Sequence, residues 1–229
     1  MKKFDWREIS GLERTYYSER IVLRPLMECD VYPIFMATTN PAFNRYLMWD
    51  APSTINELSG RIKNILDERR KGLMGVWVAA EITTGAFVAL FRSFQVEPPE
   101  GTDELHLETG IWLHPNYWLG GLSVEVSSIS FDLLFDETPV DVLHASTHRE
   151  NKAGMGLFRS LKLEFLCDSL REHENGSLVP LYSCCLRRNQ WARFISSRNE
   201  YEDIKATQDA RLKANVVDVS SNEVRKEVI

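Results

Sequence analysis

Residues 108–125 of the chain read ETGIWLHPNYWLGGLSVE, and this stretch decides the fold. Residues 105–113 have the composition of a strand, whereas residues 122–135 carry apolar side chains at helical spacing. The turn between them contains paired glycines, Gly120 and Gly121. Such a turn leaves several N–H groups at the helix start without partners, beside the positive end of the helix dipole. The segment therefore predicts either a pyrophosphate site or a plain connection that needs glycine for its geometry.

The elements around this segment predict a mixed α/β sheet with helices on both faces. Strands are expected at 21–23, 76–82, 86–96, 105–113 and 140–145, with a further hairpin turning at 174–177. Helices are expected at 28–39, 54–72, 122–135 and 153–165. Three consecutive strands between helices rule against a simple doubly wound sheet. One parallel crossover joins the strand before the glycine turn to the strand that follows the helix.

Length and composition predict one domain that needs neither metal nor disulfides to fold. The chain has 229 residues, of which 44% are hydrophobic, and this is enough to bury a sizeable core. We expect a single domain over residues 1–198. Residues 199–229 are rich in charge and contain one aromatic residue, Tyr201, so a charged C-terminal tail or helix is expected there.

Charge and cysteine usage restrict the function classes. The formal net charge is −6, which disfavours nucleic-acid binding because that class usually needs a basic face. The four cysteines form no CxxC motif, so we expect neither a disulfide framework nor a metal site. The first residues contain no apolar leader, and no stretch is long and apolar enough to cross a bilayer. We therefore expect a cytoplasmic protein that does not bind membranes.

Five segments, in order, resemble the GNAT acyltransferase superfamily, and in particular its RimJ- and RimL-like branch of ribosomal-protein N-terminal acetyltransferases. They are residues 19–26 (ERIVLRPL), 108–113 (ETGIWL), 117–125 (YWLGGLSVE), 151–154 (NKAG) and 181–183 (LYS) with Trp191. The branch usually has Y-W-G-K-G-Y-A-T-E in the third segment. The resemblance covers about residues 18–195 and implies a GNAT fold, with a central, mixed, mostly antiparallel sheet of about seven strands flanked by helices on both faces.

The resemblance implies acetyl-CoA as the acyl donor, with no metal. The expected acyl-CoA contacts are Ile111, Trp112, Leu113, Trp118, Gly120, Gly121, Leu122, Ser123 and Asn151. A free N–H near Leu113, where the family's sheet splays, would polarise the thioester carbonyl. Asn151 precedes a helix, so it is expected to cap that helix and also to bond pantetheine or a water in the cleft. The loop departs from the branch, because Leu119 replaces its first glycine and Gly120 its basic residue.

The resemblance also implies the catalytic residues. Glu108 is the expected base, acting on the amine directly or through a water. The alternative for Glu108 is a carboxylate on a solvent face, or one paired with an arginine such as Arg24. Gly154 and Phe158 replace the family's serine and tyrosine at the positions offered as general acid, which leaves Ser183 as a weak substitute.

The expected acceptor is a primary amine, either a protein N-terminus or a small molecule. An α-amine is roughly 10% neutral at pH 7, whereas a lysine is neutral at only about 0.04%, so lysine needs a base more. Residues 97–108 contain five acidic side chains and no Lys or Arg. They would attract a cationic amine if they border the cleft, and would otherwise form a solvated loop. The competing function is a CoA-binding regulatory module without turnover. Either a monomer or a homodimer is compatible with these features.

Overall fold

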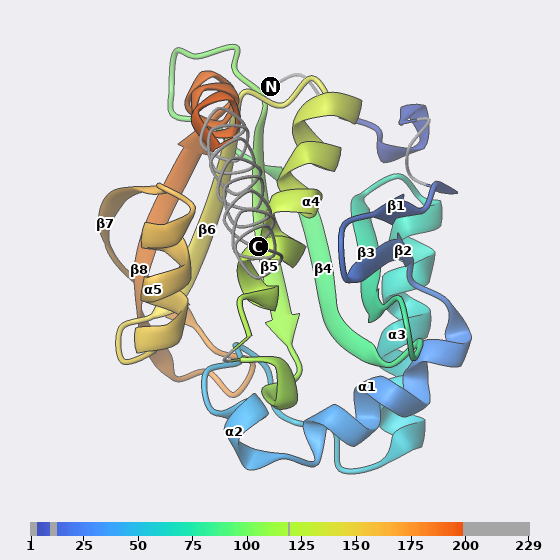
Figure 1. Cartoon of the computed structure of the whole chain (residues 1–229). Helices are drawn as coiled ribbons and strands as arrows, with labels where there is room; N and C mark the ends of the chain where they lie inside the picture. The colour runs from blue at the N-terminus through green and yellow to red at the C-terminus, as the bar shows by residue number, and fades with distance from the viewer. Residues whose placement is uncertain (1–3, 10–12, 119, 199–229) are drawn as a thin grey trace, which may run out of the picture. The chain divides into compact units, whose positions relative to one another are not determined.

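The computed structural model describes residues 4–9, 13–118 and 120–198, and its elements are labelled in Figure 1. The strands are β1 (Tyr16–Tyr17), β2 (Ile21–Pro25), β3 (Met74–Glu81), β4 (Phe87–Val96), β5 (His106–Leu113), β6 (Val142–His148), β7 (Glu164–Glu172) and β8 (Leu178–Arg187). The helices are α1 (Val31–Thr38), α2 (Pro41–Asn44), α3 (Ile55–Arg70), α4 (Leu122–Glu137) and α5 (Lys152–Ser160), with 3-10 turns η1 (Trp6–Glu8), η3 (Glu28–Asp30) and η4 (Pro115–Tyr117).

The strands form one eight-stranded sheet in the order β1-β2-β3-β4-β5-β6-β8-β7. All neighbouring strands in it are antiparallel except β5 and β6, which are parallel and are joined through α4. This confirms the expected mixed, mostly antiparallel sheet with one parallel crossover. The short strand β1 adds an eighth strand to the seven or so expected, because the lead-in segment pairs with β2 through Tyr16 and Tyr17.

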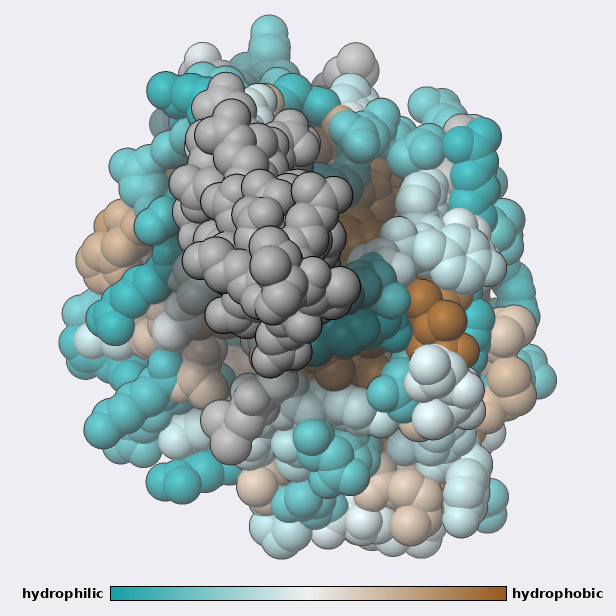
Figure 2. Space-filling model, in the orientation of Figure 1, coloured by the Kyte–Doolittle hydropathy of each residue, from teal (hydrophilic) through white to brown (hydrophobic). Residues whose placement is uncertain are grey.

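The two faces of the sheet are covered by different helices. Val76, Val78 and Leu90 face α1 and α3 in one hydrophobic cluster with Ile34 and Ile62. The helices α4 and α5 lie on the opposite face, in front of the sheet in Figure 1. Hydrophilic residues predominate on the surface shown in Figure 2, and hydrophobic ones are dispersed among them. Apolar side chains therefore mainly fill the layers between the sheet and its helices.

The sheet opens between β5 and β6. These strands pair only from His106–Val142 to Thr109–Ala145, although β5 continues to Leu113 and β6 to His148. Beyond Thr109 the remaining residues of β5 keep their partners on β4 alone. The last four residues of β5 therefore border a gap in the sheet, directly before the loop that leads into α4.

The predicted helix at 153–165 is wrong at its C-terminal end. α5 stops at Ser160, and Phe165 belongs to β7. The chain turns at Lys162, which has a left-handed φ of 59°, and the N–H of Leu163 donates to the carbonyl of Phe158 at 3.0 Å. This 6→1 bond is the closing hydrogen bond of a Schellman motif, in which the left-handed position is normally a glycine.

The chain divides into two compact units, residues 1–188 and 189–229. The first unit contains the whole sheet. Residues 189–198, the described part of the second unit, are helical. The predicted tail at 199–229 lies outside the described residues, so its boundary stays a prediction. None of the helices that the structure describes has the length and hydropathy of a membrane-spanning segment.

We predict that Lys162→Gly stabilises the protein by about 1 kcal/mol, because glycine avoids the steric cost of a left-handed side chain. The measurement is the free energy of unfolding in urea. Lys71→Gly is the matched control, since Lys71 also ends a helix but has a right-handed φ of −76°. Equal effects of the two substitutions would show that Lys162 carries no strain.

Candidate active site

The glycine loop forms the start of α4. Gly121 is the N-cap residue, and its φ of 73° is the left-handed conformation that glycine adopts without strain. Within the described part of the chain, the amides of Gly120, Gly121, Leu122 and Ser123 donate to no protein acceptor. The structure thus presents four unbonded N–H groups at the positive end of α4, which is the geometry of an anion site.

The anion site predicted from the sequence spans the amides from Tyr117 to Val124, but fewer of these amides are free in the structure. The amides of Tyr117 and Trp118 donate to the carbonyls of His114 and Pro115, and the amide of Val124 donates to the carbonyl of Gly121. Leu119 lies outside the described residues. The indole Nε1 of Trp118 donates to the carbonyl of Leu113 at 2.8 Å, which fastens the loop to the end of β5.

An arginine from another segment stabilises the loop. Arg20, just before β2, donates from Nη1 to the carbonyl of Gly120 at 3.0 Å and from Nε to the Glu125 carboxylate at 2.7 Å. Ser18 donates to the same carboxylate at 2.8 Å. Burial raises the pKa of Glu125, but the hydrogen bonds from Arg20 and Ser18 outweigh it and leave the pKa below its usual value. Arg20 thus places a cation at the loop, where the branch's basic residue is replaced by Gly120.

Glu108 lies on β5 one residue before the ladder with β6 ends, opposite His144. Both of its carboxylate oxygens accept hydrogen bonds from Arg171 on β7, one of them at 3.1 Å. The predicted alternative partner, Arg24, instead forms two hydrogen bonds to Asp30, at 2.7 and 2.8 Å. Arg171 therefore holds the Glu108 carboxylate in place through both of its oxygens.

A cavity of about 490 Å³ opens beside Glu108. Its lining includes residues 96–99, His144, Arg171 and Ser183, so the acidic segment that follows β4 does border a pocket. The Ser183 hydroxyl lies 2.8 Å from that of Ser169 and 3.3 Å from that of Ser146.

The other residues predicted near the cleft occupy several environments. Trp112, beyond the last β5–β6 pair, packs against Trp49 with ring centroids 5.0 Å apart. The guanidinium of Arg92 lies over the rings of Trp112 and Phe94, 5.6 Å from each centroid. Asn151 caps α5 by accepting from the Gly154 amide at 3.0 Å, as expected. Its Nδ2 also donates to Thr147 at 3.0 Å.

Neither of the two positions at which the family offers a general acid can supply one in this chain. A Cβ on Gly154 would lie 2.3 Å from the Thr147 hydroxyl oxygen, so a serine would not fit without a shift. Phe158 is buried in a cluster with Ala145 and Cys184. Cys184 is buried, and burial raises the pKa of its thiol to about 11. In the described ranges, no three His, Cys, Asp or Glu side chains gather in a way that could hold a metal ion.

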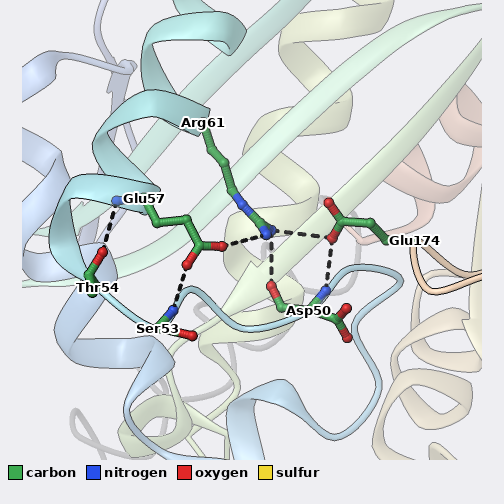
Figure 3. A network of polar contacts seen from close by, with 6 residues as sticks. All are labelled: Asp50, Ser53, Thr54, Glu57, Arg61 and Glu174. Atoms are coloured by element: carbon green, nitrogen blue, oxygen red, sulfur yellow. Dashed lines mark hydrogen bonds and ion pairs between the residues drawn. The ribbon is translucent and has the colours of Figure 1, made fainter.

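A polar network links α3 and the loop before it to the β7–β8 turn (Figure 3). Arg61 on α3 donates to the Glu57 carboxylate at 2.8 Å and to the Asp50 carbonyl at 2.9 Å, and lies 3.4 Å from Glu174 in the β7–β8 turn. The Asp50 amide also donates to Glu174 at 3.0 Å. The loop before α3 is therefore fastened to the β7–β8 turn.

Several residues of this site escaped the sequence analysis, namely Arg20, Glu104, His106, His144 and Arg171. Each acquires its role from a partner distant in sequence. The one local signal was the pair of histidines on successive predicted strands, which becomes informative only when the register between the strands is known.

Comparison with known proteins identifies the family. The family described as the acetyltransferase (GNAT) domain matches residues 20–164, which include β2, the sheet opening and the α4 loop. A search of the curated proteins found no match.

Solved structures share the fold at low sequence identity. RimJ of Mycobacterium smegmatis, in complex with CoA-disulfide, superposes with a TM-score of 0.66 at 14% identity and covers 77% of this chain and 88% of its own. The ribosomal-protein-S5-alanine acetyltransferase of Vibrio fischeri gives 0.65 at 11% identity, covering 78% and 98%. RimL, a ribosomal L7/L12 α-N-protein acetyltransferase in complex with coenzyme A, gives 0.64 at 12% identity, covering 77% and 99%. Because the family match spans residues 20–164, most of the first compact unit, the chain belongs to the GNAT acetyltransferases, which use acetyl-CoA to acetylate amines.

Proposed function

We propose that this acetyltransferase binds the diphosphate of acetyl-CoA at the start of α4 and acetylates a protein N-terminus held in the cavity beside Glu108. The observation that carries the proposal is the set of four unbonded amides at residues 120–123, beside a sheet that opens between β5 and β6. Acetyl-CoA supplies an activated acetyl group as a thioester. The residues of the chain fit this donor, because the free N–H groups match the acceptor oxygens of a diphosphate.

The other residues of the site are assigned roles in binding the donor, in protonation and in attracting the acceptor. The N–H groups near Leu113, beyond the last β5–β6 pair, are proposed to polarise the thioester carbonyl. Asn151 is proposed to face the pantetheine arm while it caps α5. Ser183 is proposed to protonate the leaving thiolate, and its two hydroxyl neighbours offer a path for replacing that proton. Glu97 and Glu108 line the cavity and are proposed to attract the cationic acceptor.

Three considerations favour a peptide N-terminus as the acceptor. The solved relatives with similar folds include enzymes whose names specify ribosomal-protein N-terminal substrates. The cavity borders an acidic segment and has Glu97 in its lining. An α-amine also needs less help to lose its proton than a lysine does. A cytoplasmic location and a monomer or homodimer stay predictions.

The second candidate is a CoA-binding regulatory module without turnover. It is favoured by Gly154, whose surroundings exclude the family's serine, and by the burial of Phe158 where a tyrosine would be offered. Both functions require CoA binding, so only turnover separates them.

We predict that the protein releases free thiol from acetyl-CoA only when an amine is present, and faster with short peptides bearing a free N-terminus than with N-terminally blocked peptides containing lysine. The measurement is thiol release over a panel of peptides and small amines. Tight CoA binding without release for any amine would favour the regulatory module. Release with small amines alone would overturn the peptide acceptor.

We predict that Gly121→Ala weakens CoA binding by about 10-fold or more, since the loss of one charge-assisted hydrogen bond has this size. The matched control is Gly85→Ala in the β3–β4 turn, where φ is 70° and an added Cβ meets no atom within 4 Å. Both substitutions impose similar backbone strain, but only the first disturbs the amides at residues 120–123. Calorimetric titration with CoA measures the difference, and equal affinities for the two variants would remove the loop from the site.

A further inference from the structure

Two histidines stack on the parallel pair of strands at the bottom of the sheet opening. His106 on β5 and His144 on β6 have ring centroids 5.0 Å apart, and Nδ1 of His106 lies 2.8 Å from Nε2 of His144. Both histidines line the cavity, but His106 is only 3% exposed, whereas His144 is partly exposed. One buried imidazole is therefore bonded directly to another that reaches the proposed acceptor pocket.

A carboxylate fixes the direction of this hydrogen bond. Oε2 of Glu104 lies 3.2 Å from Nε2 of His106. The other carboxylate oxygen of Glu104 accepts a hydrogen bond from Arg187 at 2.7 Å. The hydrogen bond from Arg187 is the main cause that lowers the pKa of Glu104, followed by that from His106. An ionised carboxylate can only accept, so Nε2 of His106 carries a hydrogen, and in the neutral ring its Nδ1 is then the acceptor. It follows that His144 donates from Nε2.

This tautomer leaves Nδ1 of His144 with a free lone pair. Within the described residues, that nitrogen has no hydrogen-bond partner, and it is absent from the buried polar atoms that lack one, so it keeps contact with solvent. Burial lowers the pKa of His144, and any positive charge on His106 would lower it further, so the ring is neutral at pH 7. A neutral imidazole with a free lone pair is a proton acceptor.

The position of His144 suits the transfer reaction. His144 is the β6 partner of Glu108, one pair before the strands part. Both side chains line the same cavity, but Glu108 is held by Arg171 through both oxygens. We propose that His144 is the general base of the acetyl transfer, and that His106 and Glu104 are residues that position it. This inference rests on the proposed function.

The proposed step balances as follows. Nδ1 of His144 takes one proton from the acceptor ammonium, R–NH₃⁺, and becomes an imidazolium. The amine nitrogen then forms a bond to the acetyl carbon, and the carbon–sulfur bond breaks with its electron pair on sulfur. Ser183 gives a proton to the thiolate, a second proton leaves the nitrogen and replaces the one that Ser183 lost, and the proton on His144 passes to water. In sum, R–NH₃⁺ and acetyl-CoA give R–NH–COCH₃, CoA–SH and one H⁺.

Titratable and charged groups around His144 influence its pKa and therefore the pH dependence of the reaction. These neighbours are His106 and Glu108 on β5, Arg171 on β7, Cys185 and Arg187 on β8, and Glu104 before β5. Glu108 raises the pKa of His144, and Arg187 lowers it along with burial and His106. The base is neutral at pH values between the pKa of His144 and the pKa of the amine, which is near 8, so wild-type kcat/KM forms a plateau in this range. At pH values below the pKa of His144, kcat/KM falls.

The experiment is kcat/KM against pH for the full chain with acetyl-CoA and a peptide acceptor. We expect His144→Gln to lower kcat/KM at pH 7 by about 10²–10⁴-fold. The loss should shrink as the pH passes about 8, where the α-amine becomes neutral without a base. A structural defect would instead give a loss that does not depend on pH. His173→Gln, in the β7–β8 turn, is the control and should match wild type.

Glu104→Gln tests the positioning role. The carbonyl oxygen of the new amide stays on Arg187, so its NH₂ group faces His106 and donates to Nε2. Both tautomers then reverse, and Nδ1 of His144 carries a hydrogen. We expect kcat/KM to fall by about 10-fold or more at pH 7 with the plateau lost, while CoA affinity is unchanged.

The outcomes separate this inference from the proposed function. Wild-type protein that binds CoA but releases no thiol with any amine contradicts the proposed function. Wild-type turnover together with full activity and an unchanged pH profile in His144→Gln contradicts the inference alone. Loss of the plateau in Glu108→Gln, but not in His144→Gln, assigns the base to Glu108 and also overturns it.

Discussion

The separation of β5 from β6 is the constraint on which the site depends. Four residue pairs hold the two parallel strands together, and beyond Thr109 each strand continues with its other neighbour only. The opening leaves the last residues of β5 beside a gap and directs the chain into the loop that starts α4. The free amides of that loop follow the last residue of β5, whereas the cavity is lined by Glu108, which is nearer the start of the same strand.

Arginines from distant segments fix the carboxylates of the site. Arg20 holds Glu125, Arg171 holds Glu108, and Arg187 holds Glu104. All three arginine side chains are more than 40% exposed, so these ion pairs add little to stability. Their effect is positional, because each pair fastens one element of the site to another strand or segment. In each case the orientation of the carboxylate is decided by a contact that spans the fold.

Local signals in the sequence were sufficient for most of the fold. Thr54 caps α3 as predicted, by accepting from the Glu57 amide, and the turn before Phe87 closes the β3–β4 hairpin. The glycine pair before α4 likewise follows from short-range rules. The end of α5 was missed because its stop signal is Lys162, a residue that rarely adopts a left-handed conformation.

The chemistry of the cavity could not be predicted in the same way. Arg24 was weighed as the partner of Glu108, but the β7–β8 register brings Arg171 there and leaves Arg24 with Asp30. The bond between His106 and His144 likewise depends on the register of β5 and β6. Side-chain pairs of this kind are set by strand pairing over long separations, for which single-sequence patterns carry no signal.

The central claim is that the start of α4 binds the diphosphate of CoA through backbone amides. Nitrogen–proton NMR spectra of the labelled protein, recorded with and without CoA, test it most directly. The account predicts that the amide protons of residues 120–123 move downfield on saturation, as protons do when they donate to a charged oxygen. It would be contradicted if these four signals stayed in place while CoA shifted signals elsewhere in the protein.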